Sequence, residues 1–173
     1  MDLLDRLLQH DAWTTRHLLD VCATLNDAQL DQEFDIGHRT LRATLHHIIH
    51  NMEVWTSLMM QEEIQRQSNL TIPGMTQRLT VAEERLANLA RKVARDEAWD
   101  KLWTDQLDDP PRDKAYGTSI AHIITHSMHH RAQVLYMLRV SGVKPLPEGD
   151  VFSWEAQWKS DLVKSNHTPS GDS

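Results

Sequence analysis

The sequence predicts an all-α protein, a four-helix bundle that is either up-and-down or built with a crossover connection. Gly and Pro number only 6 each among 173 residues, and they gather at a few positions that break the chain. Between the breaks, apolar residues recur at spacings of three and four, the period of an amphipathic helix. We expect one domain over residues 1–160 and a disordered tail over residues 161–173.

The first two predicted helices cover residues 2–25 and 40–65. Asn26 and Asp27 end the first, and residues 30–37 form a connector. In the second helix, a stripe of apolar side chains lies within about 80° of arc on a helical wheel, which is typical of a core face. The stripe consists of Leu41, Leu45, Ile48, Met52, Trp55 and Met59.

The third predicted helix covers residues 76–95, because Pro73 and Gly74 break the chain before it. Residues 80–83 resemble a capping box, so the helix could also begin there. Residues 108–111 contain two Pro and form a loop. On either side of this loop we expect a short helical turn or two short strands.

The fourth predicted helix covers residues 118–141. Thr118 or Ser119 is a natural N-cap, and Gly142 is a natural residue for ending the helix. Three aromatic side chains beyond it are expected to fold back over the bundle. They are Phe152, Trp154 and Trp158.

Composition excludes several classes of protein. Lys and Arg total 18, and Asp and Glu total 25, which gives a net charge of -7. This charge argues against a protein that binds nucleic acid by general neutralisation of phosphates. A single Cys excludes a disulfide framework within the chain and a multi-Cys zinc site. No apolar run approaches about 18 residues, so no membrane span is expected. The opening residues lack the features of a signal peptide, and we expect a cytoplasmic protein.

Histidine is the unusual residue in this chain. Seven of the 11 His lie in two short windows, one in the second and one in the fourth predicted helix. Imidazole is a common metal ligand, and two His four residues apart on a helix can bind one ion. The windows contain His46, His47 and His50, and His122, His126, His129 and His130.

Position relative to the core favours three of these seven. In the fourth helix His130 lies about 80° and His126 about 120° from the centre of the apolar arc, so both flank the core. In the second helix His47 lies about 120° from the centre of the stripe. We therefore favour a metal site of His47, His126 and His130. A His-rich surface or a pH-sensitive dimer interface is the alternative.

Two motifs give the chain a resemblance to a known family. Residues 44–49 read TLHHII and are followed by Trp55, and residues 122–133 read HIITHSMHHRAQ. With residues 10–13 (HDAW), these segments resemble the DinB/YfiT-like family of metalloproteins over roughly the first 155 residues. The resemblance implies a four-helix bundle, often a homodimer, in which His47, His126 and His130 bind a divalent metal.

The chain departs from the family pattern at three positions, and one of them is His10, where the family usually has an aromatic residue. Ala132 stands where the family usually has Gly, and an acidic residue often found near Asn51 is displaced to Glu53. Because Glu53 faces away from His47 on the wheel, we do not assign it as a general base.

Several other residues have a structural and a functional interpretation. Arg131 falls near the centre of the apolar arc, so it either pairs with a buried carboxylate, Asp11 or Asp150, or anchors a substrate carboxylate. Ser127 and Cys22 are interpreted as core residues, and the thiol of Cys22 as inert. Four Trp could line a pocket but are more typical of the core, and His10 could have a role in a pocket. The Trp are Trp13, Trp55, Trp154 and Trp158.

The predicted function follows from the ligand set and the resemblance. Zinc or nickel is favoured at a three-His site, with iron or manganese as alternatives, and an open position is left for water or substrate. The resemblance implies a thiol S-transferase or related enzyme acting on a small thiol or an anionic substrate. The alternatives are a metal-dependent hydrolase and a non-catalytic metal-binding stress-response protein that acts through dimerisation.

Overall fold

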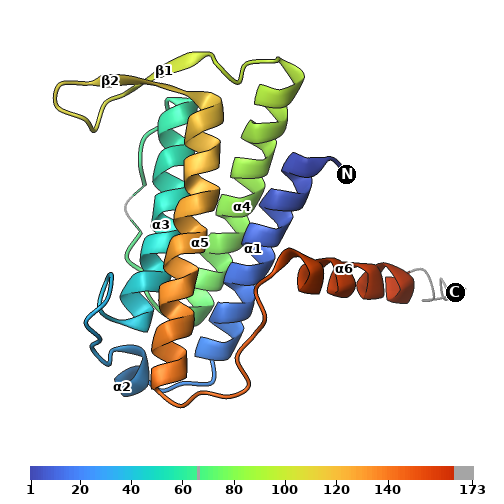
Figure 1. Ribbon diagram of the computed structural model, residues 1–173. Helices are drawn as coiled ribbons and strands as arrows, with labels where there is room; N and C mark the ends of the chain where they lie inside the picture. The colour runs from blue at the N-terminus through green and yellow to red at the C-terminus, as the bar shows by residue number, and fades with distance from the viewer. Residues whose placement is uncertain (66, 166–173) are drawn as a thin grey trace, which may run out of the picture.

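The computed structural model describes residues 1–65 and 67–165, and within these ranges it contains six helices and one two-stranded sheet (Figure 1). The predicted all-α class and the bundle are confirmed. The elements are α1 (Leu3–Cys22), α2 (Asp27–Leu30), α3 (Leu41–Met60), α4 (Ile72–Arg95), β1 (Leu102–Asp105), β2 (Arg112–Ala115), α5 (Tyr116–Val140) and α6 (Val151–Ser165).

The bundle consists of α1, α3, α4 and α5, and its connections are not simply up-and-down. α3 packs chiefly against α5 and α4, and α1 packs chiefly against α4 and α5. Figure 1 shows α3 and α4 running in the same direction, so the chain between them crosses the length of the bundle. Of the two predicted arrangements, the one with a crossover connection is therefore correct. α3 and α5 are antiparallel neighbours, and they carry the two His windows.

The core face of α3 is the one that the stripe predicts. Leu41, Leu45 and Ile48 are fully buried, whereas Trp55 is only partly buried. Thr40 caps the helix by accepting a hydrogen bond from the Ala43 amide at 3.0 Å. The helix ends at Met60, five residues earlier than predicted, because the next residue takes a left-handed conformation.

α4 begins at Ile72, so the break predicted at Pro73 and Gly74 is wrong, as is a start at the capping box of residues 80–83. Thr71 is the N-cap and accepts a hydrogen bond from the Gly74 amide at 3.2 Å. Proline is tolerated in the first turn of a helix, where its missing N–H has no intrahelical partner to lose.

The segment between α4 and α5 forms the second of its two predicted alternatives, a pair of antiparallel strands. Trp103 is buried at the base of this hairpin and donates from Nε1 to Ser119 Oγ at 3.0 Å. α5 starts at Tyr116, two residues before the predicted position, and Ala115 at the N-cap makes no side-chain cap. The Ser119 hydroxyl instead donates to the Ala115 carbonyl within the helix.

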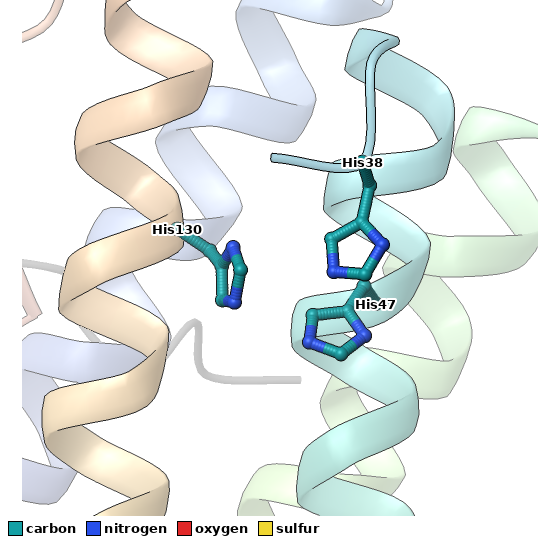
Figure 2. A group of neighbouring side chains, drawn as sticks. All are labelled: His38, His47 and His130. Atoms are coloured by element: carbon teal, nitrogen blue, oxygen red, sulfur yellow. The ribbon is translucent and has the colours of Figure 1, made fainter. Parts of the chain in front are cut away.

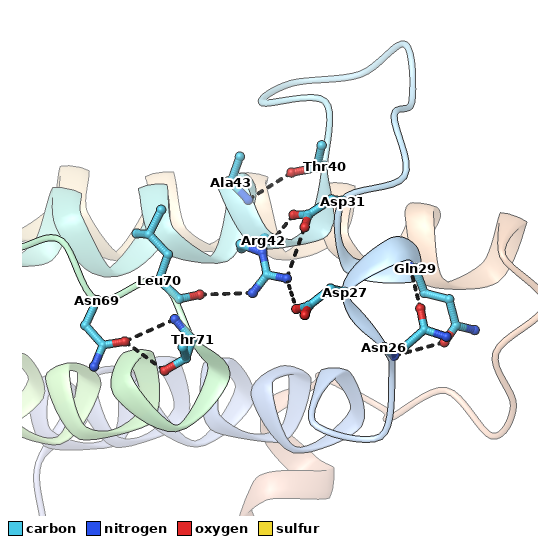
Figure 3. Close-up of polar contacts among 10 residues, drawn as sticks. All are labelled: Asn26, Asp27, Gln29, Asp31, Thr40, Arg42, Ala43, Asn69, Leu70 and Thr71. Atoms are coloured by element: carbon cyan, nitrogen blue, oxygen red, sulfur yellow. Dashed lines mark hydrogen bonds and ion pairs between the residues drawn. The ribbon is translucent and has the colours of Figure 1, made fainter.

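The connector between α2 and α3, residues 31–40, is held by Arg42, as Figure 3 shows. Its guanidinium donates to Asp31 and to Asp27 of α2, and also to the Leu70 carbonyl at 3.2 Å. α2 has its own capping box, in which Asn26 and Gln29 exchange hydrogen bonds. One arginine at the start of α3 therefore fixes α2, the connector and the approach to α4.

The C-terminal segment forms α6, which packs against α1 and points away from the bundle (Figure 1). Trp154 is buried as expected, but Phe152 is 83% exposed, so its predicted return to the bundle is wrong. We expected disorder from residue 161, whereas α6 continues through Ser165. The rest of that expected tail, residues 166–173, lies outside the described residues. No helix in the described part of the chain is long and apolar enough to cross a membrane.

Candidate metal centre

The three predicted ligands lie together at the interface of α3 and α5. His47 comes from α3, and His126 and His130 occupy successive turns of α5. The Nε2 atom of His126 lies 3.1 Å from Nε2 of His47 and 3.2 Å from Nε2 of His130. Two antiparallel helices thus place Nε2 of His126 close to Nε2 of both His47 and His130.

These distances suit a shared metal ion. Two imidazoles bound to zinc at about 2.0–2.1 Å in tetrahedral geometry have nitrogens about 3.3–3.4 Å apart. The observed separations of 3.1 and 3.2 Å are close to that value. These two separations therefore fit imidazoles that share an ion.

The hydrogen bonds around His130 determine which of its nitrogens is free. Its Nδ1 lies 2.9 Å from Oε1 of Gln133, an oxygen that can only accept, so the proton sits on Nδ1 and the lone pair on Nε2. The Gln133 amide nitrogen donates in turn to Nε2 of His129 at 3.0 Å. Gln133 therefore holds His130 in the tautomer that a metal ligand at Nε2 needs.

Proton accounting at the three Nε2 atoms also favours a cation. Because Nε2 of His130 carries a lone pair, a proton on Nε2 of His126 can satisfy either His130 or His47, but not both. At least one close nitrogen pair then lacks a proper hydrogen bond, and Nδ1 of His126 is buried without a partner. A divalent ion accepts all three lone pairs at once, so the donor set fits such a group.

The three imidazoles are held neutral, which is the form that binds metal. Burial, followed by the charges of neighbouring histidines, lowers the pKa of His47 to about 3 and that of His126 to about 4. Burial also lowers the pKa of His130. At neutral pH the three rings are therefore not protonated to imidazolium, and their lone pairs are available to a metal ion.

A fourth imidazole, which the sequence did not predict, lies beside His47 and His130. His38 lies on the connector before α3, and one nitrogen from each of His38, His47 and His130 lies within 4.8 Å of the others (Figure 2). This cluster could hold a metal ion. His38 is exposed, His47 is half-buried and His130 is buried. The connector has no helical period, so a wheel argument could not have selected His38.

Aromatic rings continue the site along the α3–α5 interface. The Trp55 ring lies 5.2 Å from that of His122 and 5.9 Å from that of Trp103, in edge-on arrangements. The ring centres of His122 and His126 are 5.2 Å apart. The Lys114 ammonium lies 4.6 Å from the centre of the Trp55 ring. Trp55 and His122 therefore flank the site on its side nearest the hairpin.

The other histidines of the two windows serve different contacts. His46 Nδ1 lies 3.0 Å from a guanidinium nitrogen of Arg78, and His50 lies 3.7 Å from a carboxylate oxygen of Glu53. Glu53 also accepts two hydrogen bonds from Arg78, at 2.9 and 2.7 Å. Glu53 is therefore engaged away from the three Nε2 atoms, as expected for a residue not assigned as a base.

The remaining candidates have structural roles. Arg131 pairs with Asp11, both almost fully buried, which decides between its two predicted partners. Asp150 instead caps α6 by accepting from the Ser153 amide at 3.0 Å. His10 is buried and bonds to a backbone carbonyl at 2.8 Å, so it fastens the C-terminal connector rather than lining a pocket.

One cavity of about 670 Å³ lies where the C-terminal ends of α3 and α4 meet the start of α5, and Met59, Leu89 and Tyr116 are among its lining residues. None of the clustered histidines lines it. The imidazole cluster at the α3–α5 interface is thus separate from this cavity.

The fold and the site together define a helical-bundle protein with a histidine cluster that could hold a metal ion. A family model agrees with this description: that of the DinB family matches residues 1–160, and the chain belongs to this family. No curated protein matches the chain.

Proposed function

We propose that this protein is a metal-dependent enzyme whose divalent ion is held by Nε2 of His47, His126 and His130. The observation that carries the proposal is the approach of these three atoms to within 3.1 and 3.2 Å along the triad. Neutral imidazoles suit zinc or nickel best, and iron or manganese can use the same donors.

The chain's own residues prepare the site in three ways. Gln133 keeps the lone pair of His130 on Nε2 by holding its proton on Nδ1. Burial keeps His47 and His126 neutral. Trp55 and His122 limit the side of the site nearest the hairpin. When bound, a divalent ion would supply positive charge that lowers the pKa of a thiol or a water at the open side.

We propose a small thiol as the substrate and S-transfer as the reaction. The sulfur of the thiolate forms a bond to an electrophilic carbon, the bond from that carbon to its leaving group breaks, and the group departs with the electron pair. The thiol proton goes to solvent. Three neutral ligands leave the charge of the ion uncompensated, which favours an anionic substrate such as a thiolate.

Arg131 is excluded as the substrate anchor, because it is buried in its ion pair with Asp11. Metal-assisted hydrolysis uses the same centre with water in place of the thiol, so it is the alternative reaction. A non-catalytic metal-binding protein is the alternative of a different class. These readings differ in turnover, which makes them separable by assay.

We also propose a homodimer that uses the outer face of α5. Met128, Tyr136 and Val140 lie on this helix at intervals of eight and four residues and are 59%, 51% and 56% exposed. Exposed apolar residues that share one helix face are typical of an interface. A cytoplasmic location and a role in a stress response stay predictions.

The first experiment measures the metal content of purified protein by mass spectrometry. We expect one ion per chain in the wild type and in His50→Ala, which alters α3 away from the triad, and none in His126→Ala. A wild type without stoichiometric metal would refute the site.

The second experiment measures turnover of the metal-loaded protein with low-molecular-weight thiols and an aryl halide electrophile, beside ester hydrolysis. Thiol transfer that depends on His47 is the expected result. Ester hydrolysis alone would favour the hydrolase, and no turnover with either would favour the non-catalytic protein.

A further inference from the structure

We propose that His38 is a fourth ligand, carried on the connector before α3, which closes the metal centre until a substrate thiolate displaces it. The inference rests on the proposed function, because it needs an ion at His47, His126 and His130. It adds a residue that the helical motifs do not contain, and it assigns the connector a part in the reaction cycle.

The position of the His38 ring is the first observation. Its centre lies 3.7 Å from that of His47 and 5.2 Å from that of His130. Figure 2 shows His38 above His47, with His130 facing both from α5. His126 contacts Nε2 of both His47 and His130, so His38 and His126 each adjoin the same pair of imidazoles. Four nitrogen donors would be enough to complete a tetrahedral zinc or cobalt centre.

The backbone of the connector is built to place this ring. Gly37 and Arg39, on either side of His38, both have positive φ, 48° and 69°. For Arg39 that conformation costs about 1 kcal/mol or more, and it persists only where surrounding contacts impose it. The turn supplies such contacts: the Phe34 amide donates to the Arg39 carbonyl at 2.7 Å, and the Arg39 amide donates to the Ile36 carbonyl at 2.9 Å.

Both ends of the connector are anchored. Phe34 is buried in the core, and Arg42 of α3 binds Asp27 and Asp31. Gly37 lies so close to the Gln133 side chain that a Cβ there would come within 2.1 Å of Oε1. The turn that carries His38 thus packs on the same amide that orients His130.

Exposure decides which ligand an incoming substrate would replace. His38 is the exposed member of the cluster, whereas His130 is buried and His47 is half-buried. His126 and His47 lie on long helices, so their displacement would need movement of the bundle. His38 lies on a short turn, so a thiolate, a softer and anionic ligand, can take its position with only local movement.

The test compares wild type, His38→Ala, His47→Ala and the control His17→Ala, all loaded with cobalt(II). His17 lies on α1 against Trp13, away from the cluster. Two readouts apply: the visible absorption of cobalt, which is strong for four-coordinate and weak for six-coordinate ions, and the affinity for zinc in competition with a chelator.

We expect wild type and His17→Ala to show the strong four-coordinate spectrum. His38→Ala should still bind one ion per chain, with an altered spectrum and an affinity at least about 10-fold weaker, because loss of even a residue that only supports a ligand costs that much. Added imidazole should restore the spectrum of His38→Ala without changing that of the wild type. Since His38 is exposed, its removal should leave the helical circular dichroism unchanged.

The outcomes separate the two proposals. If His38→Ala keeps the wild-type spectrum and affinity while His47→Ala loses the metal, His38 is not a ligand and the three-His centre stands. If the wild type binds no cobalt or zinc, the proposed function fails and the inference fails with it.

Discussion

The contact between Gly37 and Gln133 predicts that alanine substitutions at two glycines strain the backbone alike but change the metal affinity differently. Gly37 has a φ of 48°, and a Cβ added there would lie 2.1 Å from Oε1 and 2.8 Å from Cδ of Gln133. Gly142 has a φ of 78° and no atom within 4 Å of an added Cβ. Gly37→Ala and Gly142→Ala therefore share the strain, and only the first disturbs another side chain.

The strain is of similar size in both variants. An alanine in the left-handed region costs about 1–2 kcal/mol, and the lower entropy of its unfolded chain returns about 0.4–1 kcal/mol. Each variant should therefore lose about 1 kcal/mol of unfolding free energy. Gln133 adds little to this loss, because the far end of its flexible side chain can move away.

That movement breaks the hydrogen bonds by which Gln133 orients the site. Its bond to Nδ1 of His130, 2.9 Å long, and its bond to His129, 3.0 Å long, would both be lost from Gly37→Ala. Loss of such a partner of a metal ligand costs about 10- to 100-fold in affinity, which is about 1.4–2.7 kcal/mol of binding free energy. Gly142→Ala should bind metal as the wild type does.

Urea unfolding of the metal-free proteins measures the strain, and competition with a chelator measures zinc affinity. Two more variants complete a double-mutant cycle: Gln133→Ala, and Gln133→Ala combined with Gly37→Ala. In the double variant, Gly37→Ala should add little to the loss of zinc affinity that Gln133→Ala already causes. Equal zinc affinity in Gly37→Ala and Gly142→Ala would refute the reasoning, because the shift of Gln133 would then have no effect on His130.

Two further predictions concern the core beside the site. Arg131→Met should lower the unfolding free energy by about 3–5 kcal/mol in urea titrations, because it leaves the buried Asp11 carboxylate unpaired. The double variant with Asp11→Leu should recover part of this, and equal losses in the two would contradict a buried ion pair. Burial raises the pKa of Cys22 to about 12, so a thiol reagent at pH 8 should label it only in unfolding concentrations of urea. Rapid labelling of the native protein would show that this thiol is accessible.

Much of the fold could be predicted because long amphipathic periods report directly on burial. The stripe on α3 was found from spacing alone, and its aliphatic members are buried. The sequence does not predict the start of α4, because Pro73 and Gly74 indicate a break, although Thr71 before them is a good cap. Phe152 is predicted to fold back over the bundle although it is exposed, because an aromatic residue type does not indicate which helix face it occupies. Local residue types therefore predict the long elements better than the places where they begin.

The candidate site also contains residues that the sequence can predict and one residue that it cannot. His47, His126 and His130 lie on regular helices, so angle on a wheel could relate each of them to the core, and the structure brings their Nε2 atoms together. Their assignment as ligands stays a proposal. His38 is placed by the packing of Gly37 against Gln133, residues far apart in the sequence, and no local period encodes that contact. A glycine directly before a histidine near the cap of α3 is the only local signal for it.

A centre with four protein ligands is usually structural, so the proposed closed site needs a reason to be functional. A structural zinc supplies folding energy, and a small domain such as a zinc finger is unfolded without the ion. Here α3 buries Leu45, Ile48 and Met52 on its core face, while His47 lies on the flank of the same helix. The bundle thus has an apolar core that does not depend on the metal. Since the fold does not need a fourth bond to the ion, His38 as the proposed ligand would be free to exchange with a substrate thiolate.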